Sequence, residues 1–275
     1  LNMHPEIINS LAYIKKAAAI TNCEIGMLDK KKAKAIVQAC DEILEGKLHG
    51  DFIVDPIQGG AGTSLNMNAN EVIANRAIEI LGGEKGDYSI INPNDDVNCG
   101  QSTNDVIPTA GKMTSLRLLK NLKKELLRLH KALCAKAKEF DHVIKMGRTQ
   151  MQDAVPIRLG QEFNAYSVAV MRDIHRMDRA MEEMCTLNMG GTAVGTGINA
   201  DEAYLRRIVP NLVEVSDMEF VQAYDLIDAT QNLDPFVAVS GAVKACAVTL
   251  SKIANDLRLM SSGPRAGFGE INLPA

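Results

Sequence analysis

The segment PIRLGQEFNAYSVAVMRDIHRMDRAMEEMCTL, residues 156–187, decides the fold. Its large apolar residues recur every seven positions, at Phe163, Val170, Met177 and Met184, with Leu159 and Tyr166 beside them. A spacing that averages 3.5 residues per turn indicates a helix that lies nearly parallel to its neighbours and twists around them. A helix over this whole segment would be about 48 Å long at 1.5 Å per residue.

Two further segments carry the same repeat. One contains Leu119, Leu126, Leu133 and Phe140, with Leu122 and Leu129 on a second track. The other contains Phe236, Val243, Leu250 and Leu257, with Val239, Cys246, Ile253 and Met260 on a second track. Aromatic residues make up only 4% of the chain, and Trp is absent while Met reaches 13. This composition is typical of helices and not of β-sandwiches.

The sequence therefore predicts a mainly all-α fold, a long helical bundle with a smaller N-terminal helical region. We expect two partial domains, a mixed helical one over residues 1–102 and the long-helix bundle over residues 103–275. In the first, helices are predicted at 4–20, 29–46 and 67–83, and the turn-rich stretch 91–105 is predicted to be irregular. Pro108 and Pro156 are predicted at helix starts, where a missing N–H does no harm.

Composition and charge exclude several classes of protein. The net charge is −4 and the pI is about 5.8, so no general basic field is present to hold nucleic acid or an anionic membrane. No uninterrupted apolar run reaches the ~18 residues of a membrane span. The six cysteines form no CxxC and the five histidines form no HExxH, so we expect no metal site and no disulfide framework. Dispersed thiols favour a reducing, cytoplasmic location.

Four polar loops interrupt the apolar helical pattern. They are GGAGTSLNMN (59–68), GQSTND (100–105), GRTQMQDAVP (147–156) and GGTAVGTGINA (190–200). Small hydroxyl and amide groups near helix N-termini suit a carboxylate or phosphate, because free N–H groups and the helix dipole favour an anion there. Taken singly, each loop is a weak signal, and helix capping is the better explanation of an isolated Ser102-Thr103-Asn104. Four of them in one chain predict a shared anionic ligand, although none has the lysine of a phosphate-binding P-loop.

Five long motifs make the sequence recognisable. They are GGAGTSLNMNANEVIANRA (59–77), NPNDDVNCGQSTNDVIPTA (92–110), KMGRTQMQDAVPIRLGQEF (145–163), NMGGTAVGTGINA (188–200) and SKIANDLRLMSSGPRAGFGEINLPA (251–275). In order and spacing they resemble the aspartase/fumarase superfamily from about His4 to Ala275. GAGTS and QSTND are similar to the aspartate ammonia-lyase branch, since fumarases tend to carry GSGTQ and QSSND.

The resemblance implies a reversible anti-elimination that converts L-aspartate to fumarate and ammonium through an aci-carboxylate. Prearranged donors must bind this doubly charged intermediate better than they bind the substrate. By analogy, Thr63, Ser102 and Thr103 hold the β-carboxylate. Asn104 orients the amino group, with Thr149 and Gln150 beside it.

Two positions differ from many relatives. Many carry His at the position of Gln150, so we assign Gln150 a positioning role and not proton transfer. Asn92 stands where fumarases carry a His, which argues against a secondary dicarboxylate site.

The resemblance also implies a homotetramer whose active sites each draw on three subunits. This chemistry requires no cofactor. Activation of the enzyme by a divalent cation is compatible with it. The serine base is expected beyond Ala275, so that residues 1–275 hold no catalytic residue of their own. We therefore expect this chain to be a fragment that lacks both the N-terminal start and the catalytic loop, and to be inactive alone.

Two alternatives stay open at this point. Fumarate hydratase would use the same loops on fumarate and L-malate. A non-catalytic structural bundle protein would keep the helices and would not need Thr63, Ser102, Thr103 and Thr149 together.

Overall fold

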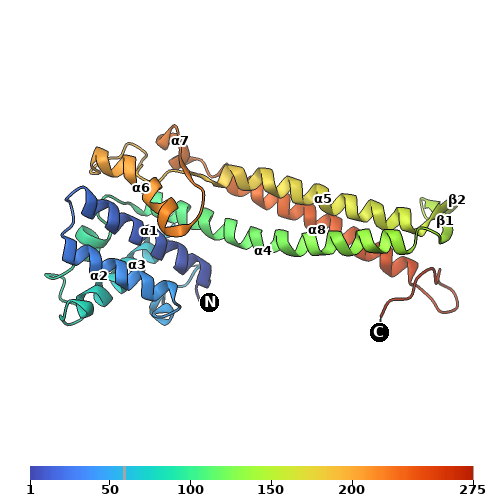
Figure 1. The fold of residues 1–275 in the computed structure, drawn as a ribbon, viewed down its shortest axis with the longest axis horizontal. Coiled ribbons are helices and arrows are strands. Elements are labelled where there is room, and N and C mark those ends of the chain that lie inside the picture. The colour runs from blue at the N-terminus through green and yellow to red at the C-terminus, as the bar shows by residue number, and fades with distance from the viewer. Residues whose placement is uncertain (58–59, 275) are drawn as a thin grey trace. The chain divides into compact units, whose positions relative to one another are not determined.

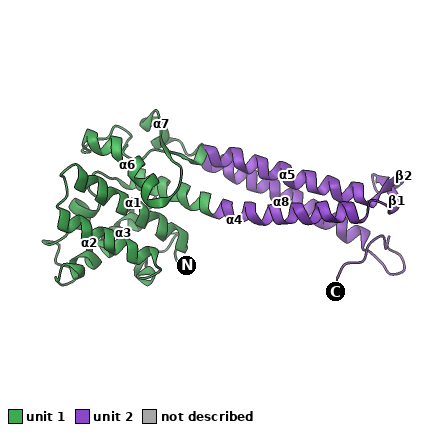
Figure 2. Ribbon diagram, in the orientation of Figure 1, with its two compact units in different colours: residues 1–117, 183–234 green, residues 118–182, 235–275 purple. Residues whose placement is uncertain are grey.

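The computed structural model describes residues 1–57 and 60–274 and is built mainly of helices, with a few short strands (Figure 1). It confirms the prediction of a mainly all-α fold with long helices. The chain forms two compact units: unit 1 comprises residues 1–117 and 183–234, and unit 2 comprises residues 118–182 and 235–275 (Figure 2). These units differ from the predicted division at residues 102 and 103. Helix α4 (Thr103–Glu139) starts in one unit and ends in the other, and the chain returns to unit 1 after residue 182.

Unit 1 contains most of the shorter helices. They are α1 (Pro5–Glu24), α2 (Lys30–Leu44), α3 (Thr63–Ile80), α6 (Glu202–Ser216) and α7 (Leu226–Gln231), with a 3-10 turn at His49–Asp51. Two-residue strands β3 (Thr186–Leu187) and β4 (Val221–Gln222) pair in parallel. Helix α1 packs against α2 and α6 around fully buried residues such as Leu11, Ile14 and Ile36.

Helices α1 and α2 of unit 1 begin with side-chain caps. The Asp29 carboxylate accepts hydrogen bonds from the backbone N–H groups of Lys31 and Lys32, which begins α2. The His4 ring accepts from Glu6 N, and Pro5 follows it as the first helical residue of α1. The predicted helices at 4–20 and 29–46 are therefore confirmed, with ends that shift by a few residues.

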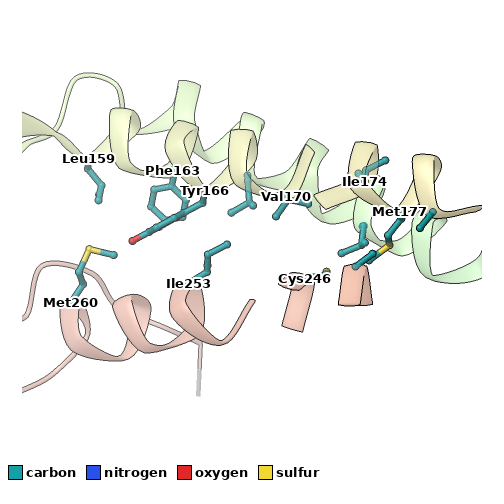
Figure 3. Packing of buried hydrophobic residues seen from close by; sticks show 13 residues of the cluster. Leu159, Phe163, Tyr166, Val170, Ile174, Met177, Cys246, Ile253 and Met260 are labelled. Carbon is teal, nitrogen blue, oxygen red and sulfur yellow. The ribbon is translucent and has the colours of Figure 1, made fainter. Parts of the chain in front are cut away.

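Unit 2 consists of most of α4, α5 (Leu159–Met184), most of α8 (Asp234–Met260) and a hairpin of β1 (Ile144–Thr149) and β2 (Gln152–Arg158). Figure 3 shows Phe163, Tyr166 and Val170 of α5 in a row that faces Cys246, Ile253 and Met260 of α8. Val170 is 0% exposed, and these repeats therefore form the core, as their spacing predicts.

The hairpin corrects two expectations. The loop predicted at 147–156 lies largely in antiparallel strands, and Pro156 pairs opposite Met146 in β2 instead of starting a helix. A proline is tolerated in a two-stranded ribbon because each strand is an edge. Pro108 is likewise not at a helix start, because α4 begins five residues earlier. The stretch 91–105 is also not wholly irregular, since Pro93–Val97 forms one π-helical turn.

Helix α8 is apolar over much of its length. An 18-residue window has a mean hydropathy of 1.5, which by length and composition alone would suit a membrane span, and this window was not anticipated from the sequence. Only 17% of that window is buried. Val237 and Val248 are 72% and 63% exposed. Helix α8 therefore presents an apolar face that the other described residues of one chain leave uncovered.

Candidate functional site

The N-termini of α3 and α4 lie together in unit 1. Gly62, which precedes α3, packs so closely on α4 that a Cβ there would lie 2.8 Å from side-chain carbons of Ile107. One turn into α3, Asn66 donates to Thr103 Oγ1 at 3.4 Å. Thr63 is the first residue of α3 and is exposed. Among the described residues no side chain caps α3, so its N-terminal dipole is left for another anion.

Ser102, Thr103 and Asn104 begin α4. Ser102 Oγ accepts from Asn104 N at 3.3 Å, and the Asp105 carboxylate accepts from Ser102 N at 2.9 Å. The pattern is similar to a capping box, except that the Ser102 hydroxyl bonds to the second helical N–H and not to the third, and the capping interpretation of the motif holds for Ser102. Ser102 and Thr103 are half-buried, whereas Asn104 is exposed. The structure thus brings four of the six predicted substrate residues, Thr63, Ser102, Thr103 and Asn104, to one region of unit 1.

The polar loop after α5 reaches the same region. Asn104 Nδ2 donates to Ala193 O at 2.6 Å, and Asn188 Nδ2 donates to Asn104 O at 2.9 Å. Asp105 accepts from the N–H groups of Gly190 and Thr192. Two of the four predicted polar loops, 100–105 and 190–200, therefore form one hydrogen-bonded unit.

A buried lysine supports the first of these loops from behind. Lys15 of α1 is 0% exposed and donates to Asn98 Oδ1 at 2.8 Å and to Gln101 Oε1 at 2.9 Å. Burial lowers the pKa of Lys15 to about 7, opposed in part by the charge of Asp105. Burial also raises the pKa of Asp105 to about 6, while its three backbone donors work against this shift. Both ionisable groups lie just beneath the predicted substrate residues.

Sequence reasoning missed Lys15, Asp105 and Asn188. The pattern Ser102-x-x-Asp105 is a sequence signal for a capping box and could have been found. Lys15 lies in the apolar helix pattern of residues 4–20 with no local motif, so its contact with a loop more than 80 residues away could not be inferred.

The other two predicted residues, Thr149 and Gln150, belong to unit 2. Thr149 ends β1 opposite Gln152, so Gln150 and Met151 form a two-residue hairpin loop. Both have positive φ, 51° and 62°, as type I′ turns require, although neither is a residue that favours this region. Thr149 and Gln150 are exposed. A strained turn that displays polar side chains is a common feature of functional sites.

A cavity of about 480 Å³ lies beside this hairpin, between β1, β2, α5 and α8. Arg148 and Thr149 line it, as do Lys145 and Glu162. Arg148 Nη2 donates to Glu270 Oε1 at 2.7 Å, and its guanidinium lies over the Phe268 ring at 3.9 Å from the centroid. Hydrogen bonds from Arg148 and Lys145 hold the pKa of Glu270 below its usual range despite burial. The ion pair of Arg148 and Glu270 thus joins the segment that follows α8 to β1.

Gly59, the first residue of the predicted loop 59–68, lies outside the described residues. In the part of the chain that the structure describes, no group of three or more His, Cys, Asp or Glu could hold a metal ion. The site is therefore made of hydroxyls, amides, backbone N–H groups and a few buried charges.

Comparison with known proteins gives three kinds of match. A model of the lyase family matches residues 2–275. The aspartate ammonia-lyase of Bacillus subtilis (strain 168) is 58% identical over 273 residues, which cover 99% of this chain and 58% of that protein. A solved fumarate lyase:delta crystallin of Brucella melitensis, bound to cobalt, has a TM-score of 0.97 at 51% identity. The match covers 98% of this chain and 59% of that protein.

A recombinant class II fumarase of Schistosoma mansoni is more distant, with a TM-score of 0.92 at 35% identity over 97% of this chain and 59% of its own. The chain thus spans 58% to 59% of the length of these three proteins.

Proposed function

Because this chain belongs to the lyase family, we propose that the whole protein catalyses the reversible elimination of ammonia from L-aspartate to give fumarate. The observation that carries the proposal is the meeting of Thr63, Ser102, Thr103 and Asn104 at the N-termini of α3 and α4. The 58% identity to an aspartate ammonia-lyase supports aspartate over other substrates of such a site.

The proposed chemistry follows from these groups. Removal of a proton from the carbon beside the β-carboxylate leaves a second negative charge on that carboxylate. Hydroxyl groups of Thr63, Ser102 and Thr103 donate to it, and two helix N-termini stabilise the charge that develops. The Asn104 amide donates to Ala193 O, so its carbonyl oxygen is the atom that accepts from the substrate ammonium. None of these side chains titrates, and the resemblance assigns the base to a serine that would follow Ala275.

The proposed site is completed by other copies of the chain. Thr149 and Gln150 are exposed at a hairpin tip in unit 2, and we assign them to the site of another subunit in a homotetramer. The uncovered apolar face of α8 supports assembly, because exposed valines such as Val237 and Val248 gain free energy when helices of other copies bury them. No cofactor enters this account. Activation by a divalent cation stays a prediction, which addition of Mg²⁺ to metal-free protein tests.

The substitution Thr103→Val in the whole protein tests the site. It removes one donor to the aci-carboxylate while it keeps the shape of the side chain. Loss of one such donor lowers kcat by about 10²–10³-fold. Thr114→Val is the matched control, because Thr114 lies further along α4 and bonds to Ser10 Oγ and Glu6 O of α1. A Thr103→Val protein with unchanged aspartate turnover would contradict the role of Thr103, whereas a wild-type protein with no turnover would favour a structural bundle protein.

Fumarate hydration is the second candidate, since a class II fumarase shares the fold at 35% identity. It predicts turnover of L-malate in place of L-aspartate. Parallel assays of the two substrates by the absorbance of fumarate separate these functions.

A further inference from the structure

We propose that Asp105 is a positioning residue for this elimination, which holds the loop 188–193 against the start of α4 and thereby sets the orientation of the Asn104 amide. The proposal rests on the proposed function for its effect on turnover. Its structural part, the attachment of the loop by Asp105, does not depend on the substrate.

The carboxylate of Asp105 joins two segments that are far apart in the sequence. Oδ1 accepts from Ser102 N at 2.9 Å, while Oδ2 accepts from Gly190 N at 3.2 Å and from Thr192 N at 3.0 Å. Asp105 is 0% exposed, so bulk water does not compete with these N–H groups for its carboxylate oxygens. A capping box alone needs only the bond to Ser102, and the two bonds from the loop go beyond capping.

The loop adopts a conformation that needs such support. Thr192 has a φ of 55°, in the left-handed region that a β-branched residue rarely adopts. Its own N–H is one of the two loop donors to Asp105 Oδ2. Loss of the carboxylate therefore frees Thr192 to return to an ordinary conformation, and Ala193 moves with it.

The effect reaches Asn104 through two further hydrogen bonds. Asn104 Nδ2 donates to Ala193 O at 2.6 Å, which directs the amide nitrogen to the loop and leaves the oxygen for a ligand. Pro108 has no N–H for the carbonyl four residues before it, and that carbonyl, Asn104 O, accepts from Asn188 Nδ2 instead. The proline that sequence analysis assigned to a helix start thus provides a second attachment point for the loop.

Only the ionised carboxylate can accept all three N–H groups without an O–H of its own in the way. Two ionisable groups of other elements interact with it: Lys15 of α1 stabilises its charge, and burial, followed by the charge of Asp105, raises the pKa of the Tyr204 phenol of α6. Because burial raises the pKa of Asp105 to about 6, the loop attachment weakens as the pH falls through that value. Turnover should fall with it.

The experiment compares wild type, Asp105→Asn and Asp173→Asn in the whole protein. Asp173 is a matched control, because it is 2% exposed, lies in unit 2 and pairs with Arg176. We expect Asp105→Asn to lower kcat for L-aspartate by about 10–10²-fold with a smaller change in KM, since the misplaced amide acts on a bound substrate. The acid limb of the wild-type pH profile near pH 6 should disappear in this variant. Asp173→Asn should keep both kcat and the limb.

Hydrogen exchange provides a readout without substrate. In wild type, protection of the Gly190 and Thr192 amides should be lost when the pH falls from about 7.5 to about 5, after correction for intrinsic exchange. This measurement stands even where Asp105→Asn fails to fold. Unchanged protection, or an Asp105→Asn protein with wild-type kcat and acid limb, overturns the proposal. Absence of aspartate turnover in wild type refutes the proposed function instead, and the exchange result then decides the role of Asp105 alone.

Discussion

Lys15 is a buried residue that forms hydrogen bonds to a loop and whose burial disfavours its charged form. It is fully buried and donates to two amide oxygens, Asn98 Oδ1 and Gln101 Oε1, so its ammonium is desolvated without a direct carboxylate contact in the described residues. Since burial lowers the pKa of Lys15 to about 7, the folded state releases its proton well below the pH at which the unfolded state does. With Lys15 in place, stability is greatest above the unfolded-state pKa of 10.5 and decreases as the pH falls from there to about 7, below which the folded state also binds the proton.

This sign leads to a prediction for Lys15→Met. In wild type the free energy of unfolding should rise by about 1–2 kcal/mol between about pH 7 and about pH 8.5, because the unfolded state still binds the proton over that range. In Lys15→Met this rise should disappear. Urea unfolding of both proteins at the two pH values measures the difference. An equal pH dependence in the two proteins would show that Lys15 is not the titrating group.

At residue scale, the sequence indicated which polar residues of unit 1 lie in one region, and it missed the residues that support them, for physical reasons. Thr63, Ser102, Thr103 and Asn104 carry small polar groups in loops, a local signal, and the structure groups them. Lys15 and Asn188 act through contacts between distant segments, and no spacing within the chain encodes such contacts. The roles of all six predicted residues stay predictions, and Thr149 and Gln150 lie in the other unit.

At the scale of elements, the repeats of large apolar residues predicted the three long helices, whereas the hairpin 144–158 was missed. A ribbon of two short strands has no buried face with its own periodicity, since six of the seven residues of β2 are exposed. Without that signal, Pro156 was assigned to a helix start. The helix begins instead at Leu159, whose N–H donates to Val143 O, while Gly160 N donates to Phe140 O.

Gly160, the second residue of α5, packs against the backbone at the end of α4, and we therefore expect a strong effect of Gly160→Ala. The added Cβ would lie 2.3 Å from Ala137 O and 2.7 Å from Asp141 Cα, and backbone atoms cannot rotate away as side chains can. We expect a loss of ~1–3 kcal/mol in the free energy of unfolding, as for other overpacked sites. Denaturant unfolding measures it. Gly50→Ala is the control, because nothing lies within 4 Å of its Cβ, and its effect should stay within ~0.5 kcal/mol. Equal effects of the two substitutions would contradict the packing described for Gly160.

On the scale of the whole molecule, one copy of the chain leaves an apolar helix face uncovered. The track of α8 that contains Cys246, Ile253 and Met260 fills the core, and Leu250 and Leu257 of the other track are partly buried against it. Val237 and Val248 belong to neither track and are 72% and 63% exposed. The spacing of the repeats predicted the core-facing residues, and it does not show which other residues of α8 contact further copies of the chain.

The assembly is tested by Val248→Glu. A charge in a buried helical interface lacks a partner, so the whole protein should dissociate into smaller species, which sedimentation velocity detects. Met27→Glu is the control, since Met27 is also exposed, at 59%, but lies between α1 and α2 in unit 1. A Val248→Glu protein that sediments as wild type would exclude this face from the interface.

The central claim concerns the reaction itself, and one assay tests it most directly. Purified whole protein is incubated in parallel with L-aspartate and with L-malate, and the formation of fumarate is followed by its ultraviolet absorbance. Our account predicts fumarate from L-aspartate with release of one ammonium for each fumarate, and none from L-malate. Fumarate from L-malate with none from L-aspartate would contradict the assignment and identify a hydratase.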